Sequence, residues 1–144
     1  MPGRGIFIAG TDTGVGKTLV ACALLRGLDN HGLRAAGMKP VAAGARLRRG
    51  IRYNEDVEQL RGTASVDVPR EVMNPYCFTP PIAPHLAARE SGQAIRMSVI
   101  AHRYTQIAAR CQVVVVEGVG GLLVPLGVRL NAADIPQRLD LPLL

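Results

Sequence analysis

The stretch GTDTGVGKT, residues 10–18, decides the fold of this chain. It follows the short apolar run GIFIAG (5–10), which is typical of a buried strand. It opens KTLVACALLRGLDNHG (17–32), where apolar residues recur at helical spacing. Backbone N–H groups in such a turn, together with the helix N-terminus, attract anions. The stretch therefore predicts a phosphate-binding loop between a strand and a helix.

Two side chains of this loop have roles that follow from their chemistry. Lys17 is expected to neutralise charge on the β- and γ-phosphates of a nucleotide, and the Thr18 hydroxyl to ligate Mg²⁺. The usual spacing requires glycine at position 11, but the chain has Thr11 there, and Gly10 comes one residue early. A plain glycine-rich turn is the alternative interpretation. The Gly-Lys-Thr triplet in this context favours a nucleotide site with an unusual front end.

Further along the chain, strand and helix patterns alternate. We expect a strand over 34–40 that ends at Pro40, a short helix over 54–62 with Asn54 as N-cap, and an amphipathic helix over 95–111. The run QVVVVEG (112–118) is typical of a strand buried on both faces, as in parallel sheets. We expect a Gly- and Arg-rich loop over 41–53 and extended coil through the five prolines of 69–85.

This order predicts an α/β fold of the P-loop NTPase type, a wound, mainly parallel sheet with helices on both faces. The length favours a single domain over residues 1–144. The last residues, LDLPLL (139–144), resemble the start of another buried strand. We therefore expect the sheet to be incomplete at the C-terminus.

Three charged residues fall where ligands bind in wound sheets. Glu117 ends the run 112–118, where an acid suits Mg²⁺ coordination, although a surface acid in a loop is the alternative. Lys39 ends the second predicted strand, where a cation could stabilise a transferring phosphoryl group; the alternative is an ordinary surface lysine. Asp56, by its position alone, is more typical of a capping or solvated acid at a helix start.

Composition narrows the function classes. The net charge is +6, but aromatic residues make up only 3% and the arginines are scattered, which argues against nucleic acid as a partner. No run is long enough to span a membrane, and the N-terminal apolar segment is too short for a signal peptide. Three widely spaced cysteines fit free thiols and a cytoplasmic location.

Five motifs, in this order, resemble the dethiobiotin synthetase family: GTDTGVGKT, GMKPVAAG, NEDV, NPYCFTPPIAPHLAA and VEGVGGLLVPL. The resemblance runs from residue 5 to the end. It implies an ATP- and Mg²⁺-dependent ligase of biotin biosynthesis. Such an enzyme joins 7,8-diaminononanoate and CO₂ into dethiobiotin, through a carbamate and a carbamic–phosphoric anhydride. It also implies a homodimer.

The resemblance also implies roles for residues. Lys39 and Lys17 would be catalytic, Thr18, Asp56 and Glu117 would bind Mg²⁺, and Thr13 would lie near the γ-phosphate and the carbamate. The implied ATP-binding set is Thr13, Gly14, Val15, Gly16, Lys17, Thr18, Leu19, Asp56, Glu117, Gly118, Val119 and Gly120. Ala43 stands at a substrate-contacting position where the family commonly has Ser or Thr, so one hydrogen bond is missing.

Two other interpretations stay open. Family members continue well past residue 144, which implies that adenine-recognising and dimer-forming segments are absent from this sequence. The chain could then be an inactive remnant. A regulatory or partitioning ATPase with a related loop is the other alternative, but such proteins have an early loop lysine where this chain has Asp12.

Overall fold

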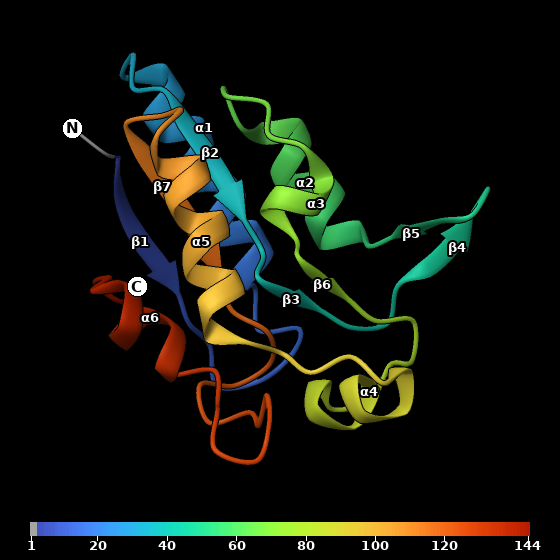
Figure 1. Ribbon diagram of the computed structural model, residues 1–144. Helices are drawn as coiled ribbons and strands as arrows, with labels where there is room; N and C mark the ends of the chain where they lie inside the picture. The colour runs from blue at the N-terminus through green and yellow to red at the C-terminus, as the bar shows by residue number, and fades with distance from the viewer. Residues whose placement is uncertain (1–2) are drawn as a thin grey trace.

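A short parallel sheet organises residues 3–144, the part of the chain that the computed structural model describes (Figure 1). It contains β1 (Arg4–Ile8), β2 (Ala35–Met38) and β7 (Val113–Glu117), in the order β1-β7-β2. The last strand in the sequence therefore lies between the first two. Both pairings are parallel, and Ile8 lies opposite Glu117 while Met38 lies opposite Val116.

Helices cover both faces of this sheet. Figure 1 shows α5 (Met97–Ala108) in front of the strands and α1 (Lys17–Asn30) behind them, and both helices contact β7. On the side of α1 lies α2 (Glu55–Thr63), while α5 packs against α3 (Arg70–Met73) and α6 (Asp134–Leu139). The predicted wound α/β fold with a parallel sheet is confirmed.

The core is aliphatic and centres on β7. Val114, Val115 and Val116 are fully buried, as expected for a strand covered on both faces. Phe7 from β1 and Leu25 from α1 pack in the same cluster. This packing holds the strand ends, and the residues that follow them, in fixed positions.

The prediction of a loop over 41–53 is wrong. Residues Val41–Ala42 form β3, which pairs in parallel with β6 (Tyr76–Cys77). Strands β4 (Arg46–Arg48) and β5 (Ile51–Tyr53) form an antiparallel hairpin. Its turn places Arg49 and Gly50 at φ 53° and 77°, which is the geometry a two-residue hairpin needs. An arginine in place of the usual Asn or Asp concealed this turn in the sequence.

The prediction of coil throughout 69–85 is also wrong. Helix α3 begins directly after Pro69, and α4 (Pro84–Ser91) has Pro84 in its first turn. Proline is well tolerated at a helix start because its missing N–H would have no partner there. These prolines therefore mark helix starts as well as extended segments.

Two further local predictions can be compared with the structure, and one of them is confirmed in full. The Asn54 side chain accepts a hydrogen bond from Val57 N at 3.2 Å and so caps α2. Residues 142–144 run beside β1, with Leu144 N donating to Phe7 O at 2.9 Å. The burial expected of this last strand is not seen, because Leu143 and Leu144 are both more than half exposed.

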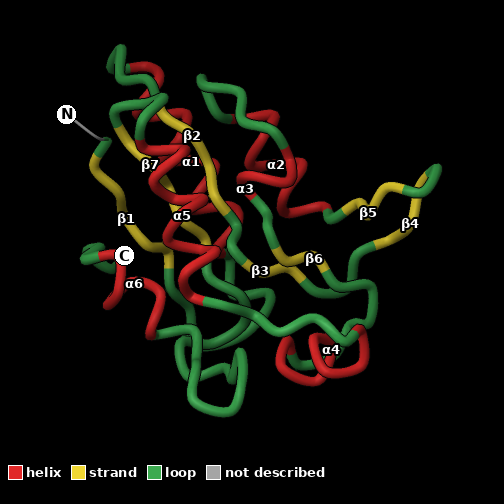
Figure 2. Tube along the Cα trace, viewed as in Figure 1, coloured by secondary structure: helices red, strands yellow, loops and turns green. Residues whose placement is uncertain are grey.

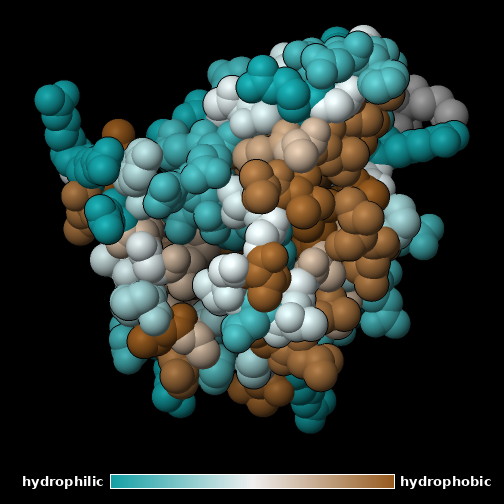
Figure 3. Space-filling model, turned by 180° about the vertical axis from the view of Figure 1, so that it is seen from behind, coloured by the Kyte–Doolittle hydropathy of each residue, from teal (hydrophilic) through white to brown (hydrophobic). Residues whose placement is uncertain are grey.

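The remaining surface has two notable features. A long irregular segment, green in Figure 2, joins β7 to α6 and is pinned by a bridge between Pro125 and Asn131. Viewed from the side of α1, the molecule shows broad apolar areas (Figure 3). Leu19 and Val20 of α1 are among the exposed large apolar side chains. Within residues 3–144, none of the helices has the length and apolar character to cross a bilayer.

Candidate functional site

The phosphate loop is formed by the residues between β1 and α1. Gly16 immediately precedes α1 and has a φ of 107°, a left-handed conformation that side-chain-bearing residues rarely adopt. Among the described residues, no side chain caps the start of α1. The N–H groups of its first turn therefore point toward an open site, where they can bind an anion.

The unusual front end of the loop has a steric explanation. A Cβ on Gly10 would lie only 2.7 Å from a methyl carbon of Val15 and 3.1 Å from the Lys17 side chain. Glycine is therefore needed at position 10, where the loop folds back on itself. Thr11, at the next position, is exposed.

The strand order brings three sequence-distant segments to one edge of the sheet. The phosphate loop follows β1, Lys39 follows β2, and Glu117 ends β7 between them. Because all three strands are parallel, their carboxyl ends meet at this edge. Ligands bind there in open α/β sheets.

Four side chains form a compact polar cluster at this edge. The Lys39 ammonium lies 3.0 Å from Glu117 Oε1 and 3.1 Å from Asp56 Oδ2. The Thr18 hydroxyl donates to the same Glu117 Oε1 at 2.7 Å. One carboxylate oxygen thus serves both the phosphate-loop threonine and the lysine.

Burial makes this pairing energetically important. Glu117 is 1% exposed and Lys39 is 4% exposed. Two charges removed from water to this degree require each other, since an unpaired buried ion is strongly destabilising. The alternatives of a surface lysine and a surface acid are therefore excluded. Asp56 lies in the first turn of α2, as expected, but it also pairs with Lys39.

Lys17 is held by its own loop. Its ammonium donates to the backbone carbonyl of Asp12 at 2.7 Å, while Asp12 Oδ1 accepts from Thr13 N at 2.7 Å. Burial lowers the pKa of Lys17, and the positive charge of Lys39 lowers it further. The carboxylates of Glu117, Asp56 and Asp12 oppose this shift.

The lowered pKa of Lys17 can be tested directly. The chain contains only two lysines, so ¹³C-labelled lysine should give two side-chain NMR signals. We expect the signal that is missing from Lys17→Arg to titrate below 10.5, the usual pKa of lysine. Between the lowered pKa of Lys17 in the folded chain and its usual pKa in the unfolded chain, the unfolded chain binds more protons. In that pH range the contribution of Lys17 to stability should therefore rise with pH. A midpoint at or above 10.5 would contradict the buried environment described for Lys17.

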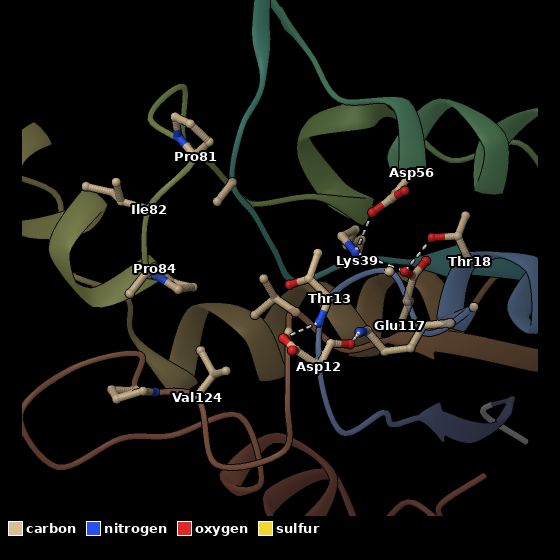
Figure 4. Close-up of a pocket in the computed structure, with 18 of the residues that line it drawn as sticks. Asp12, Thr13, Thr18, Lys39, Asp56, Pro81, Ile82, Pro84, Glu117 and Val124 are labelled. Atoms are coloured by element: carbon tan, nitrogen blue, oxygen red, sulfur yellow. Dashed lines mark hydrogen bonds and ion pairs between the residues drawn. The ribbon is translucent and has the colours of Figure 1, made fainter.

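A cavity of about 670 Å³ adjoins the cluster and has two unlike walls (Figure 4). Charged and hydroxyl side chains, including Thr18, Lys39, Asp56 and Glu117, gather on one side. On the other side lie apolar residues from the segment before α4, from the start of α4 and from the segment after β7, namely Pro81, Ile82, Pro84 and Val124. The cavity can therefore hold a ligand that is polar at one end and aliphatic at the other.

Most of the site residues predicted from the sequence meet at this cavity. Those that line it are Thr13, Gly14, Gly16, Lys17, Thr18, Leu19, Lys39, Ala43, Asp56, Glu117, Val119 and Gly120. Val15 and Gly118 do not line it, but the Gly118 carbonyl lies 3.4 Å from the Lys39 ammonium. Their chemical roles remain predictions.

Sequence reasoning missed the apolar wall. The motifs NPYCFTPPIAPHLAA and VEGVGGLLVPL contain Pro81, Ile82, Pro84, Val124 and Pro125, yet no site role was predicted for these residues. These residues belong to two of the motifs on which the family resemblance rests, and this membership could have indicated that they line the site. Asp12 also lines the cavity, although no site role is predicted for it from the sequence, where it serves only as an argument against a regulatory or partitioning ATPase.

The fold and the site define a P-loop nucleotide-binding protein of the α/β class. The chain matches the family model described as "AAA domain" over residues 4–144, and it belongs to that family.

One curated relative is the ATP-dependent dethiobiotin synthetase BioD of Aromatoleum aromaticum, which is 49% identical over 141 residues. The match covers 98% of this chain and 63% of the relative. The predicted resemblance to the dethiobiotin synthetases is confirmed. The chain spans less than two thirds of the length of this relative.

Proposed function

We propose that the chain performs the ATP-dependent synthesis of dethiobiotin from 7,8-diaminononanoate and CO₂, releasing ADP and phosphate. The observation that supports this best is the polar cluster of Lys39, Glu117, Asp56 and Thr18 beside the phosphate loop, in which Lys39 and Glu117 are buried. The name of the relative is consistent with the same reaction. We further propose that residues 1–144 act as a single domain.

The phosphates of ATP would bind at the start of α1. The left-handed Gly16 turns the backbone so that the N–H groups of the first helical turn are available to phosphate oxygens. Lys17 would exchange its bond to the Asp12 carbonyl for the β- and γ-phosphates. Because Lys17 is already held within the loop, this exchange requires only a local movement.

The residues present fit Mg²⁺. Thr18, Asp56 and Glu117 offer hydroxyl and carboxylate oxygens, the hard ligands that Mg²⁺ prefers. Glu117 Oε2 is buried and has no hydrogen-bond partner among the described residues, so it could accept a metal ion or its bound water. Within residues 3–144 no three His, Cys, Asp or Glu side chains gather as a metal site by themselves. Phosphate and water would complete the coordination, and the ion would neutralise phosphate charge.

The substrate would lie across the two walls of the cavity. Its aliphatic chain fits the apolar wall around Ile82 and Val124, and its amines would reach the polar side near Thr13. Ala43 lines the cavity without offering a hydroxyl. The missing hydrogen bond is expected to cost about 0.5–1.5 kcal/mol of substrate affinity.

The proposed reaction has three steps. One substrate amine attacks CO₂ and loses a proton, which gives a carbamate. A carbamate oxygen then attacks the γ-phosphorus and ADP leaves, forming the carbamic–phosphoric anhydride. Finally the second amine attacks the carbonyl carbon, phosphate leaves, and the amine loses a proton as the cyclic urea closes. Lys39 would stabilise negative charge on the carbamate and on the transferring phosphoryl group.

A phosphate-release assay tests this proposal. Purified chain with Mg-ATP, bicarbonate and 7,8-diaminononanoate should release phosphate and form dethiobiotin, and omission of the diamine should abolish both. A folded chain that binds ATP without turnover would favour an inactive remnant. Phosphate release without the diamine would favour a regulatory ATPase.

We also propose a homodimer acting in the cytoplasm. The exposed apolar side chains Leu123 and Val128, in the segment after β7, are consistent with a covered surface in the assembled protein. The thiols of Cys22, Cys77 and Cys111 are all free, which fits a reducing compartment. Light scattering on the purified chain would report the oligomeric state.

A further inference from the structure

Lys39 lies in a break between two strands. Strand β2 ends at Met38 and pairs with β7, while β3 begins at Val41 and pairs with β6 instead. Pro40 separates Lys39 from β3 and has no N–H to donate. The backbone of Lys39 is therefore outside both ladders and needs other partners.

Those partners come from the segment that joins α3 to β6. Lys39 N donates to the Met73 carbonyl at 2.9 Å. The Lys39 carbonyl accepts from the Asn74 side-chain amide at 2.7 Å. The same amide donates to the Tyr76 carbonyl at 3.1 Å, and Tyr76 N donates to the Pro40 carbonyl at 3.2 Å. The lysine backbone is thus clamped on both sides by residues 73–76.

Asn74 is central to this clamp. It is 6% exposed, and its amide nitrogen bridges the backbone carbonyls of Lys39 and Tyr76. It does not line the cavity. Its side chain therefore acts on the site only indirectly, through the backbone of Lys39 and of the neighbouring Tyr76.

We propose that Asn74 is a positioning residue that sets where the Lys39 ammonium lies relative to Glu117 and Asp56. This inference rests on the proposed function only for its effect on turnover. Loss of the Asn74 amide would free the Lys39 carbonyl and let the segment 39–40 shift. The ammonium would then leave its buried site between the two carboxylates for part of the time.

Amine acylation tests the positioning without requiring turnover. Since the chain has only two lysines, mass spectrometry after brief treatment with acetic anhydride can follow Lys39 with Lys17 as an internal reference. We expect Asn74→Ala to raise the acylation rate of Lys39 several-fold relative to Lys17. Equal rates for Lys39 in the variant and the wild type, or an equal increase at both lysines, would overturn the proposal.

Two further variants separate hydrogen bonding from packing. Asn74→Asp keeps the side-chain shape but its carboxylate cannot donate, so it should behave like Asn74→Ala. Asn74→Ser keeps one donor and should give an intermediate rate; it also serves if Asn74→Ala fails to fold. A wild-type rate in Asn74→Asp would show that only the volume of the side chain matters. Asn131→Ala is the control, because the Asn131 side chain also bonds the backbone, accepting from Ala133 N at 3.0 Å, but does not line the cavity.

Turnover gives the second readout. In the phosphate-release assay we expect Asn74→Ala to lower kcat by about 10–100-fold, as for other residues that orient an active-site group. KM for ATP should change little, because the phosphate loop does not contact Asn74. If the wild type is active and Asn74→Ala has the same kcat, the proposal is contradicted. If the wild type shows no turnover, the proposed function fails while the acylation result still decides the role of Asn74.

Discussion

Replacing Lys39 with alanine is expected to lower dethiobiotin formation by about 10²–10³-fold, the usual effect of removing a group that stabilises transition-state charge. The affinity for ATP should stay close to that of the wild type, because phosphate binding depends on the loop and Lys17. Product formation followed by mass spectrometry, with nucleotide binding followed by calorimetry, measures both quantities. Turnover equal to that of the wild type would exclude the proposed role of Lys39.

The second lysine provides the contrast. Lys17→Ala should weaken nucleotide binding itself, since Lys17 lies within the phosphate loop. Lys39→Ala also leaves the Glu117 carboxylate buried without its cation, a loss that can cost about 3–5 kcal/mol of stability. Lys39→Gln retains a hydrogen-bond donor and should fold better, yet it lacks the charge and should be similarly inactive. An active Lys39→Gln variant would show that charge at this position is not needed.

Replacing Glu117 with glutamine is expected to abolish the effect of Mg²⁺ on nucleotide affinity and to lower turnover on the order of 100-fold. The substitution keeps the side-chain shape and an acceptor for Thr18 and Lys39, but it removes the negative charge. Titration of ADP with and without Mg²⁺ measures this effect. In the wild type the metal should tighten binding, and in the variant the two affinities should be equal.

An acid elsewhere on the surface gives the matched control for that substitution. Glu90 is exposed in α4 and does not line the cavity, so Glu90→Gln should preserve both Mg²⁺ dependence and turnover. A Glu117→Gln variant that still responds to Mg²⁺ like the wild type would remove Glu117 from the proposed metal site.

The parts of the fold that depend on local pattern could be predicted from the sequence. The strand–loop–helix unit around Gly16 and the buried run of valines in β7 each have a periodicity or composition that few other structures share. The Asn54 cap is equally local, because its acceptor and donor are three residues apart. The hairpin at Arg49 and Gly50 was missed since its turn sequence is uncommon for that geometry.

The sequence was sufficient to predict which residues form the site, but not which hydrogen bonds and ion pairs join them. The sequence indicates that Lys39, Asp56 and Glu117 lie near the phosphate loop, and the cavity brings them together. It does not indicate that Glu117 Oε1 accepts from both Thr18 and Lys39, because these three residues are far apart in the chain and meet only through strand order. The clamp of Asn74 on the Lys39 backbone depends on the unpredicted helix α3 and strand β6 in the same way.

The central position of β7 has a consequence for the order in which the molecule can form. Arg4 and Ala35 both pair with Val113, so neither early strand has a neighbour in this sheet until more than a hundred residues have been synthesised. Contacts between such distant segments make folding slow, because a long loop must close before any pairing energy is gained. Glu117 is the final residue of that late strand. During synthesis, Glu117 therefore becomes available together with the strand that joins β1 to β2. A partly synthesised chain that lacks β7 contains the phosphate loop but not the carboxylate that pairs with Lys39.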